Sequence, residues 1–185
     1  MSLFKLLFFL LPAFSLLADN IDYFVHFIGV EDKKVVKSLQ KVSLLTTLQA
    51  KPPDSIQALR FRANDDIPNL LNVLHAYGYY DATIQVILEE QGLSIQLFVF
   101  IDPGIAYTLE EYDVSFTFEA SSYSPSCPSF CLEDLGLELG EVAIAQKIVI
   151  AEEKLLSLLS EQGYPLALVK KREMSVDGKT KGKSQ

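Results

Sequence analysis

The chain contains one motif twice. Residues 70–79 read Leu-Leu-Asn-Val-Leu-His-Ala-Tyr-Gly-Tyr, and residues 155–164 read Leu-Leu-Ser-Leu-Leu-Ser-Glu-Gln-Gly-Tyr. In both copies the spacing of the leucines predicts an apolar stripe on a helix, and Gly78 or Gly163 lies where a helix needs a left-handed residue to end. A repeat of this kind predicts small supersecondary units arranged in series. We therefore expect the 185 residues to form two units, residues 19–111 and 112–178.

Residues 1–18 have the pattern of a secretory signal peptide. One positive charge, Lys5, precedes an apolar run from Leu6 to Leu17, which is followed by Ala18 and a polar pair. A membrane anchor is the alternative, because Pro12 interrupts the apolar run. The run is shorter than the roughly 20 residues that span a bilayer, which favours a cleaved signal peptide. We expect cleavage after Ala18 and export of the mature chain.

Export determines how the two cysteines are interpreted. Cys127 and Cys131 lie in a turn-rich stretch, and an oxidising compartment favours a disulfide that closes a small loop. Two unpaired thiols are the alternative. The cysteines lack the two-residue separation of thioredoxin-like sites, and a zinc site would need further ligands in a chain with 2 histidines. We expect no bound metal.

The net charge of -8 at pH 7 argues against nucleic-acid binding. Basic side chains are concentrated toward the end of the sequence, where residues 179–185 form a polar basic tail that includes Lys179, Lys181 and Lys183. A solvated tail is the simpler interpretation of such a run. No nucleic-acid partner is therefore expected.

Hydrophobic periodicity predicts the order strand, helix, helix, strand, strand for the first unit. An aromatic and β-branched run at residues 23–28 predicts a strand, and apolar residues at helical spacing predict a helix over residues 31–48. Residues 64–66 offer capping oxygens for a second helix, with Pro68 in its tolerated first turn. Alternation of apolar and polar residues then predicts strands at residues 82–89 and 95–101.

The second unit begins in the same way and lacks its last strand. Alternation predicts a strand at residues 114–118, a short helix is indicated near residues 132–137, and a long amphipathic helix is expected from Ile144 until Gly163 ends it. A strand at residues 166–174 follows. No hydrophobic residue occurs from Thr180 to Gln185, so the strand that should return beside it is not expected. The fold class is thus α+β, with an incomplete second unit.

No residue pattern points to catalysis. His26 and His75 have no acid or nucleophile nearby in the sequence, and Asp65 and Asp66 are placed to cap a helix rather than to act as a carboxylate pair. The sequence contains no nucleophile-elbow, phosphate-loop or metalloprotease motif. We expect a protein without enzymatic activity and without a cofactor.

Six stretches of the sequence carry a resemblance to a known family. They are Phe61–Asp66, Ala76–Ile84 and Ile101–Tyr107 in the first unit, and Gly136–Gly140, Ala151–Leu156 and Gly163–Pro165 in the second. The first three resemble the first polypeptide-transport-associated (POTRA) repeat of TamA-type proteins, in the superfamily of outer-membrane assembly factors. The others are similar to the next repeat. The resemblance covers most of residues 21–177.

The resemblance implies tandem POTRA-like modules, each a three-stranded mixed sheet with two helices on one face. It also implies a location at the periplasmic face of the outer membrane. Implied partners are unfolded outer-membrane proteins, or an inner-membrane or periplasmic partner protein. Such proteins continue into a further repeat and a transmembrane β-barrel, so membrane association would depend on a barrel that this chain lacks. A free-standing envelope scaffold and a fragment of a split assembly-factor gene are the alternatives.

The family's sheet places the strand at residues 81–89 outermost. An extended peptide can add to such an edge through the unpaired backbone N–H and C=O groups, which is β-augmentation. Capture of client or partner strands is therefore expected along this strand, at Asp81, Thr83, Gln85, Ile87 and Glu89.

Overall fold

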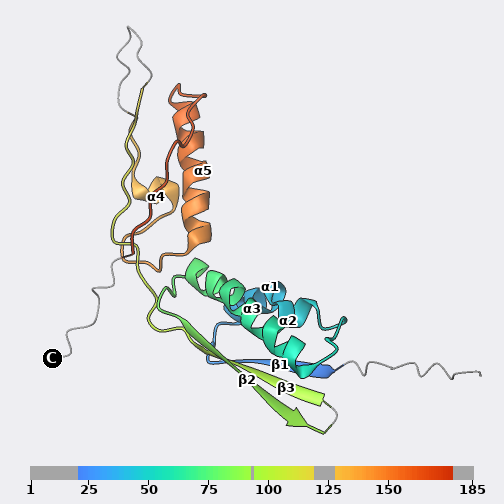
Figure 1. The fold of residues 1–185 in the computed structure, drawn as a ribbon. Coiled ribbons are helices and arrows are strands. Elements are labelled where there is room, and N and C mark those ends of the chain that lie inside the picture. Colours follow the sequence, from blue (N-terminus) through green and yellow to red (C-terminus); the bar gives the residue numbers. More distant parts are fainter. Residues whose placement is uncertain (1–20, 93, 119–127, 177–185) are drawn as a thin grey trace, which may run out of the picture.

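A mixed sheet with helices forms the first part of the chain, and a long helix with extended segments forms the second (Figure 1). The computed structural model describes residues 21–92, 94–118 and 128–176. The predicted signal peptide with Ala18, the tail at residues 179–185 and Cys127 lie outside the described residues. The elements in chain order are β1 (Asp22–Ile28), α1 (Lys33–Val42), α2 (Leu44–Thr47), α3 (Ile56–Ala76), β2 (Thr83–Gln91), β3 (Ser94–Asp102), α4 (Leu132–Leu135) and α5 (Ala145–Glu161).

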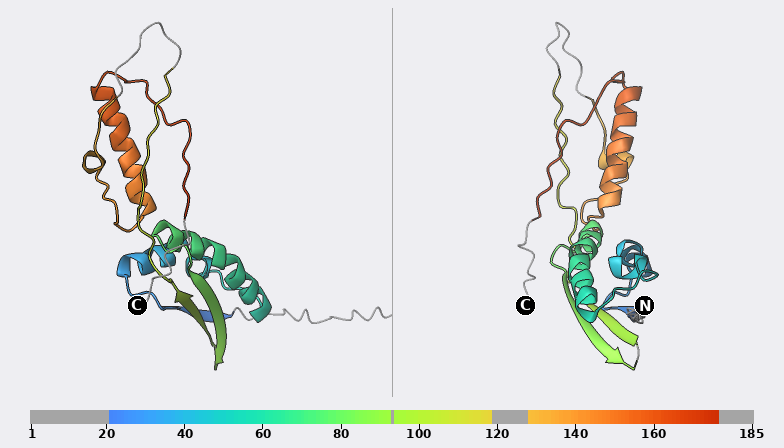
Figure 2. Two further views of the ribbon diagram at one scale, coloured as in Figure 1. Left: turned by 90° about the vertical axis from the view of Figure 1, so that its left-hand side faces the viewer. Right: turned by 45° about the vertical axis from the view of Figure 1, so that its right-hand side comes forward.

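β3 lies in the middle of the sheet. The strand order is β1-β3-β2, and β3 pairs in parallel with β1 and antiparallel with β2. Helices α1, α2 and α3 pack on one face only (Figure 2), because alternate residues of each strand point to that side. The α+β class is confirmed here, and the order of elements agrees with the prediction except that three helices, rather than two, lie between the first two strands. The inward residues of β3 are at most 4% exposed: Ile95, Leu97, Val99 and Ile101.

The first predicted helix is two helices. Ser43 separates α1 from α2 with φ -58° and ψ 125°, outside the helical region. The side chain of Ser43 is fully buried, and the turn in the chain allows Leu39 of α1 and Leu45 of α2 both to reach the core at 0% exposure. The prediction of one helix over residues 31–48 was wrong, because amphipathic spacing does not show where packing requires the chain to turn.

The second predicted helix begins earlier than expected. α3 starts after Ser55, whose Oγ accepts a hydrogen bond from the Ala58 N–H at 3.1 Å. The predicted start at residues 64–66 was wrong, and Pro68 lies inside the helix. Because proline has no N–H, the carbonyl of Asn64 lacks the hydrogen bond that residue 68 would otherwise donate to it. Asn64 and Pro68 are both exposed, so water can bond that carbonyl. The buried stripe on the opposite side runs unbroken past the proline: Leu59, Ala63, Asp66, Leu70 and Leu74.

Asp66 caps a helix other than its own. Its side chain is fully buried and accepts three hydrogen bonds, from Ser43 Oγ at 2.5 Å, from the Leu44 N–H at 2.8 Å and from the Leu45 N–H at 3.1 Å. The two N–H groups belong to the first turn of α2, where a helix leaves such groups unpaired. Asp65 is exposed. The capping role predicted for this pair of residues therefore falls to Asp66, and it acts on α2.

The α5 unit, residues 109–118 and 128–176, has helices but no strand among its described residues. The predicted strands at residues 114–118 and 166–174 were wrong, since both stretches are irregular and belong to no sheet. A strand needs a bonded neighbour, and the sequence predicts no middle strand to pair with both. α4 and α5 lie close to the predicted helices. The buried cluster of this unit is Leu135, Leu137, Ala151, Leu155 and Leu159.

A hydrogen-bonded junction joins the sheet to the α5 unit. The Tyr107 N–H donates to the Gly78 carbonyl at 2.8 Å, and the Tyr107 carbonyl accepts from the Ala143 N–H at 2.9 Å. Gly78 is buried with φ +87°, and a Cβ added to it would lie 2.9 Å from Val142 Cγ1. Gly78 therefore follows the end of α3 in a left-handed conformation and leaves room for the junction.

Gly78→Ala is expected to destabilise the protein by about 1–3 kcal/mol, because alanine at positive φ is strained and its methyl group meets Val142. Chemical denaturation followed by circular dichroism measures the loss. Gly92→Ala is the matched control, since Gly92 has φ +64° and nothing lies within 4 Å of the added methyl group. Equal losses in the two variants would show that backbone strain alone sets the cost.

Candidate protein-binding edge

β2 has a free edge along its length. It pairs with β3, and no other described residue forms a backbone hydrogen bond with it. In Figure 1 β2 lies on the outside of the sheet, separated from β1 by β3. The row of N–H and C=O groups on its outer side is therefore available to another extended chain.

The length of the hairpin determines which backbone groups point outward. β2 ends at Gln91 and β3 begins at Ser94, and these two residues lie opposite each other. A two-residue hairpin closes on a pair that exchanges both hydrogen bonds, and bonded pairs then alternate with unbonded pairs. Every second residue of β2, counted back from Gln91, therefore bonds to β3. The residues of β2 whose backbone groups point to the free edge are therefore Ile84, Val86, Leu88 and Glu90.

The side chains predicted for binding lie on the open face of the sheet. Ile87 lies opposite Phe98 and Gln85 opposite Phe100, and Ile87 and Phe100 are each 38% exposed. Thr83 and Glu89 are also exposed. These side chains can contact an added strand, while its backbone bonds would come from the residues between them. A hollow of about 210 Å³ opens on this face, lined by Ile28, Gly29, Thr83, Gln85, Phe100, Ile101 and Asp102.

Asp81 lies before β2 and belongs to the junction. Its Oδ2 accepts a hydrogen bond from the Tyr107 hydroxyl at 2.8 Å. This hydrogen bond, with a smaller contribution from desolvation, raises the pKa of Tyr107 above its ordinary value. Tyr80 contacts the Tyr107 ring edge-on at 5.5 Å between ring centroids. The Asp81 carboxylate is therefore engaged within the chain.

The other edge of the sheet is partly occupied. The Gln49 side chain donates from Nε2 to the Tyr23 carbonyl of β1 at 2.9 Å, and the Ile21 N–H donates to the Pro53 carbonyl at 3.3 Å. Arg62 Nη1 holds the same loop through two of its carbonyl groups. The loop between α2 and α3 thereby covers the start of β1. Among the described residues, the outer side of β2 has no such cover.

Comparison with known proteins gives one structural likeness. No protein-family model matches the sequence, and no curated protein matches it. The chain is similar to a crystal structure of Haemophilus influenzae BamA POTRA3-5. The TM-score is 0.39 and the sequence identity 15%. The match covers 78% of this chain and 51% of the other, so this chain spans about half the length of the matched structure.

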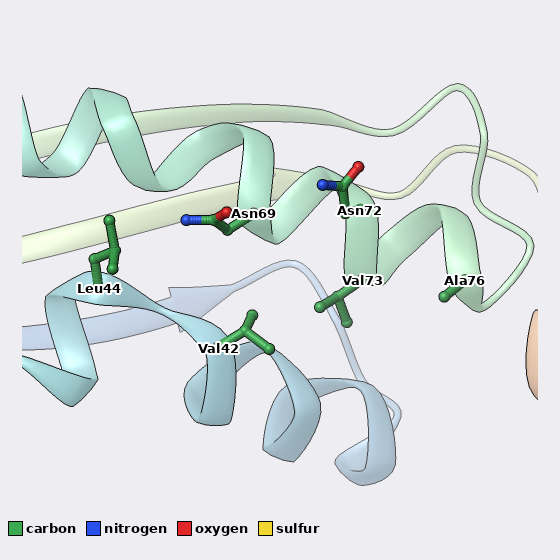
Figure 3. A pocket seen from close by; sticks show the side chains of 6 residues that line it. All are labelled: Val42, Leu44, Asn69, Asn72, Val73 and Ala76. Carbon is green, nitrogen blue, oxygen red and sulfur yellow. The ribbon is translucent and has the colours of Figure 1, made fainter.

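The helical side carries a groove of about 490 Å³ between α1–α2 and α3 (Figure 3). Val42, at its rim, is 40% exposed. The lining is apolar apart from two amides, so the groove offers packing and amide hydrogen bonds but no acid, base or nucleophile. Its lining residues are Val42, Leu44, Asn69, Asn72, Val73 and Ala76.

The two histidines and Cys131 contact neighbouring side chains of the chain. The His26 ring stacks on Phe98 at 5.2 Å between centroids, and its Nε2 lies 2.8 Å from Gln96 Oε1. His75 stacks on Tyr80 at 5.6 Å. Cys131 is exposed, and its hydrogen bond with the Asp134 carboxylate raises the pKa of the thiol. Since Cys127 lies outside the described residues, the disulfide between Cys127 and Cys131 stays a prediction.

Metal-ligating clusters and membrane-spanning helices are absent from the described residues. No group of three or more His, Cys, Asp or Glu side chains in residues 21–92, 94–118 and 128–176 is arranged to hold a metal ion. No helix in the same residues is long and apolar enough to cross a membrane.

Proposed function

We propose that this chain is a non-catalytic, periplasmic protein-binding part of an outer-membrane protein assembly or translocation factor. In this proposal residues 1–18 direct export, and residues 19–111 and 112–178 are two POTRA-like modules. The clients are unfolded outer-membrane proteins, or an inner-membrane or periplasmic partner protein. The resemblance of Phe61–Asp66, Ala76–Ile84 and Ile101–Tyr107 to POTRA sequences supports the assignment.

The observation that carries the proposal is the difference between the two edges of the sheet. β1 is covered at its start by the Gln49 side chain, whereas β2 has no described backbone partner on its outer side. An extended client strand can add beside β2 by bonding to the backbone of Ile84, Val86 and Leu88. Recognition through backbone groups tolerates many client sequences, which suits a factor that handles many unfolded proteins.

The strength of this capture follows from the number of bonds. Each backbone hydrogen bond contributes about 0.5–1.5 kcal/mol net, and ordering the peptide costs a comparable amount per residue. We therefore expect dissociation constants of about 10 μM to 1 mM for single strands. Apolar client side chains that reach Ile87 and Phe100 on the open face would raise the affinity.

Val86→Pro tests the edge directly. It removes an N–H that points to the free edge and is expected to reduce crosslinking of an unfolded outer-membrane protein to a photoreactive side chain at position 85 by at least about tenfold. Val86→Ala is the matched control, because it removes the same side chain and keeps the N–H. Equal crosslinking of the two variants would exclude capture through the β2 backbone.

A further inference from the structure

Two extended segments of the α5 unit run along α5 in opposite directions, residues 110–118 away from the sheet and residues 166–176 back toward it (Figure 2). Both contact the buried cluster of the α5 unit, the first through Val114 and Phe116 and the second through Ala167. The second segment is also held at its far end, where Arg172 pairs with Glu152 of α5. The two segments therefore have fixed places on one side of α5.

No backbone hydrogen bond joins these segments. Within the described part of the chain, the backbone groups of residues 110–118 and 168–176 have no backbone partner. Large apolar side chains nearby are in contact with solvent, with Leu166 90%, Leu168 66% and Met174 58% exposed. The first segment nevertheless has the exposure pattern of a strand, since Tyr112, Val114 and Phe116 are half-buried and the residues between them exposed.

The sheet unit of the same chain, which consists of β1 to β3 with α1 to α3, shows how such a pair of segments is completed. In the sequence, β1 precedes α3, the helix that carries the first copy of the repeat, and β2 follows it. In the sheet, β3 lies between β1 and β2. β3 forms seven residue pairs with β1 and nine with β2, and its inward side chains are nearly completely buried. By the repeat, residues 110–118 correspond to β1 and residues 166–176 to β2. Nothing in the described part of the α5 unit corresponds to β3.

We propose that the α5 unit binds an extended strand of a separate protein between residues 110–118 and residues 166–176. The strand would run parallel to the first segment and antiparallel to the second, as β3 does between β1 and β2. Its chemistry follows from that position: about seven to nine residues, apolar at every second position toward α5 and polar at the others. An acidic residue among the polar ones suits the exposed Lys170.

The residues that directly follow the second segment do not fit this place. In the sheet unit β3 follows β2 after two residues. The residues that follow Val176 read Asp-Gly-Lys-Thr-Lys-Gly-Lys-Ser-Gln and contain no apolar side chain. A tight hairpin like that between β2 and β3 therefore cannot supply the alternating apolar face that the α5 cluster lacks. This site is independent of the β2 edge, since here the strand enters the middle of a sheet rather than adding to its outside.

Amide exchange of the full chain, measured residue by residue by NMR, tests the proposal. The probe is the synthetic peptide Ser-Ile-Gln-Leu-Lys-Val-Glu-Ile-Asp, which keeps the inward residues of β3 and has charged residues in place of Phe98 and Phe100. The control peptide has the same composition with its apolar residues contiguous. With the probe we expect the amides of residues 112–118 and 168–174 to exchange at least tenfold more slowly, and with the control peptide to remain unchanged.

Two substitutions separate the two faces of the second segment. In the strand pairing proposed above, Val169 would share the face of Ala167, which packs on the buried cluster of the α5 unit, and Leu168 would point to the other side. Both are already exposed, at 42% and 66%, so Val169→Asp and Leu168→Asp are expected to leave the free protein folded. Val169→Asp should abolish the protection by the probe, and Leu168→Asp should retain it.

Three results would overturn the proposal. The first is unchanged exchange of residues 112–118 and 168–174 at saturating probe. The second is protection confined to Ile84, Val86 and Leu88, which would assign the peptide to the β2 edge. The third is protection that appears without peptide as the protein concentration is raised, which would make a second copy of this chain the occupant.

Discussion

Asp66→Ala is expected to destabilise the sheet unit by about 3–5 kcal/mol, the largest loss among single substitutions in this chain that remove no core hydrocarbon. The substitution leaves the Ser43 hydroxyl and the Leu44 and Leu45 N–H groups without their acceptor. Ser43 is fully buried, so water reaches its hydroxyl only if the helices move apart. Urea denaturation followed by the circular dichroism of the sheet unit measures the loss.

Asp65→Ala is the control for the Asp66 experiment, because Asp65 is the exposed neighbour on the same helix. It should change the free energy of unfolding by no more than about 0.5 kcal/mol. Asp66→Asn should fall between the two, since the amide keeps one acceptor oxygen and brings an NH₂ group next to N–H donors. Similar small effects in all three variants would show that α2 does not depend on this cap.

The case of Asp66 illustrates how far the sequence predicts the fold. Three acceptor side chains before an apolar run predict a helix start, and Pro68 just after them strengthens that interpretation. The structure instead places the start at Ile56, because the buried stripe extends from Leu59 through Leu74 and outweighs the proline. Capping of α2 by a residue distant in sequence depends on tertiary packing, which local patterns do not contain.

The strands of the sheet unit were predictable for a different reason. The alternation in residues 82–89 and 95–101 reports which side of the sheet is buried, and β2 and β3 cover nearly all of these stretches. The same alternation in residues 114–118 did not produce a strand, because a strand also depends on a neighbour that alternation does not reveal. Alternation therefore predicts which face of a segment is buried, but it does not predict whether the segment pairs with a neighbouring strand.

The candidate site shows the same division between pattern and packing. The sequence, through the resemblance, predicts an outer strand at residues 81–89, and β2 lies at the edge of the sheet. The two residues between Gln91 and Ser94 already indicate that the backbone of Ile84, Val86 and Leu88 faces the free edge. The residues predicted for binding were instead the ones that alternate with these, such as Gln85 and Ile87. The cover of β1 by Gln49 could not be anticipated, because it depends on the path of a loop.

The α5 unit is expected to exchange its backbone amides at least 100-fold faster than the sheet unit, with fast exchange from about Val114 onward and strong protection between Phe24 and Val99. Among the described residues, the core of the sheet unit contains 12 buried residues, whereas the core of the α5 unit contains the five that form its buried cluster. Each large apolar side chain left partly exposed forfeits up to about 1.5–3 kcal/mol, which is comparable with the stability of a small domain. Hydrogen exchange of the free chain, measured by NMR at one pH, tests this expectation.

The repeat supplies an internal control for the exchange experiment. Leu70 and Leu74 of α3 correspond to Leu155 and Leu159 of α5, in helices of 21 and 17 residues with similar leucine spacing. Since helix propensity and local sequence are alike, a difference in exchange between these two pairs reports the packing around each helix rather than the helix itself. The first pair is 0% exposed and covered by a complete sheet, and the second is 6% exposed. Equal protection of the two pairs would mean that a further segment already completes the core of the α5 unit. The place proposed above for a partner strand would then be filled by this chain itself.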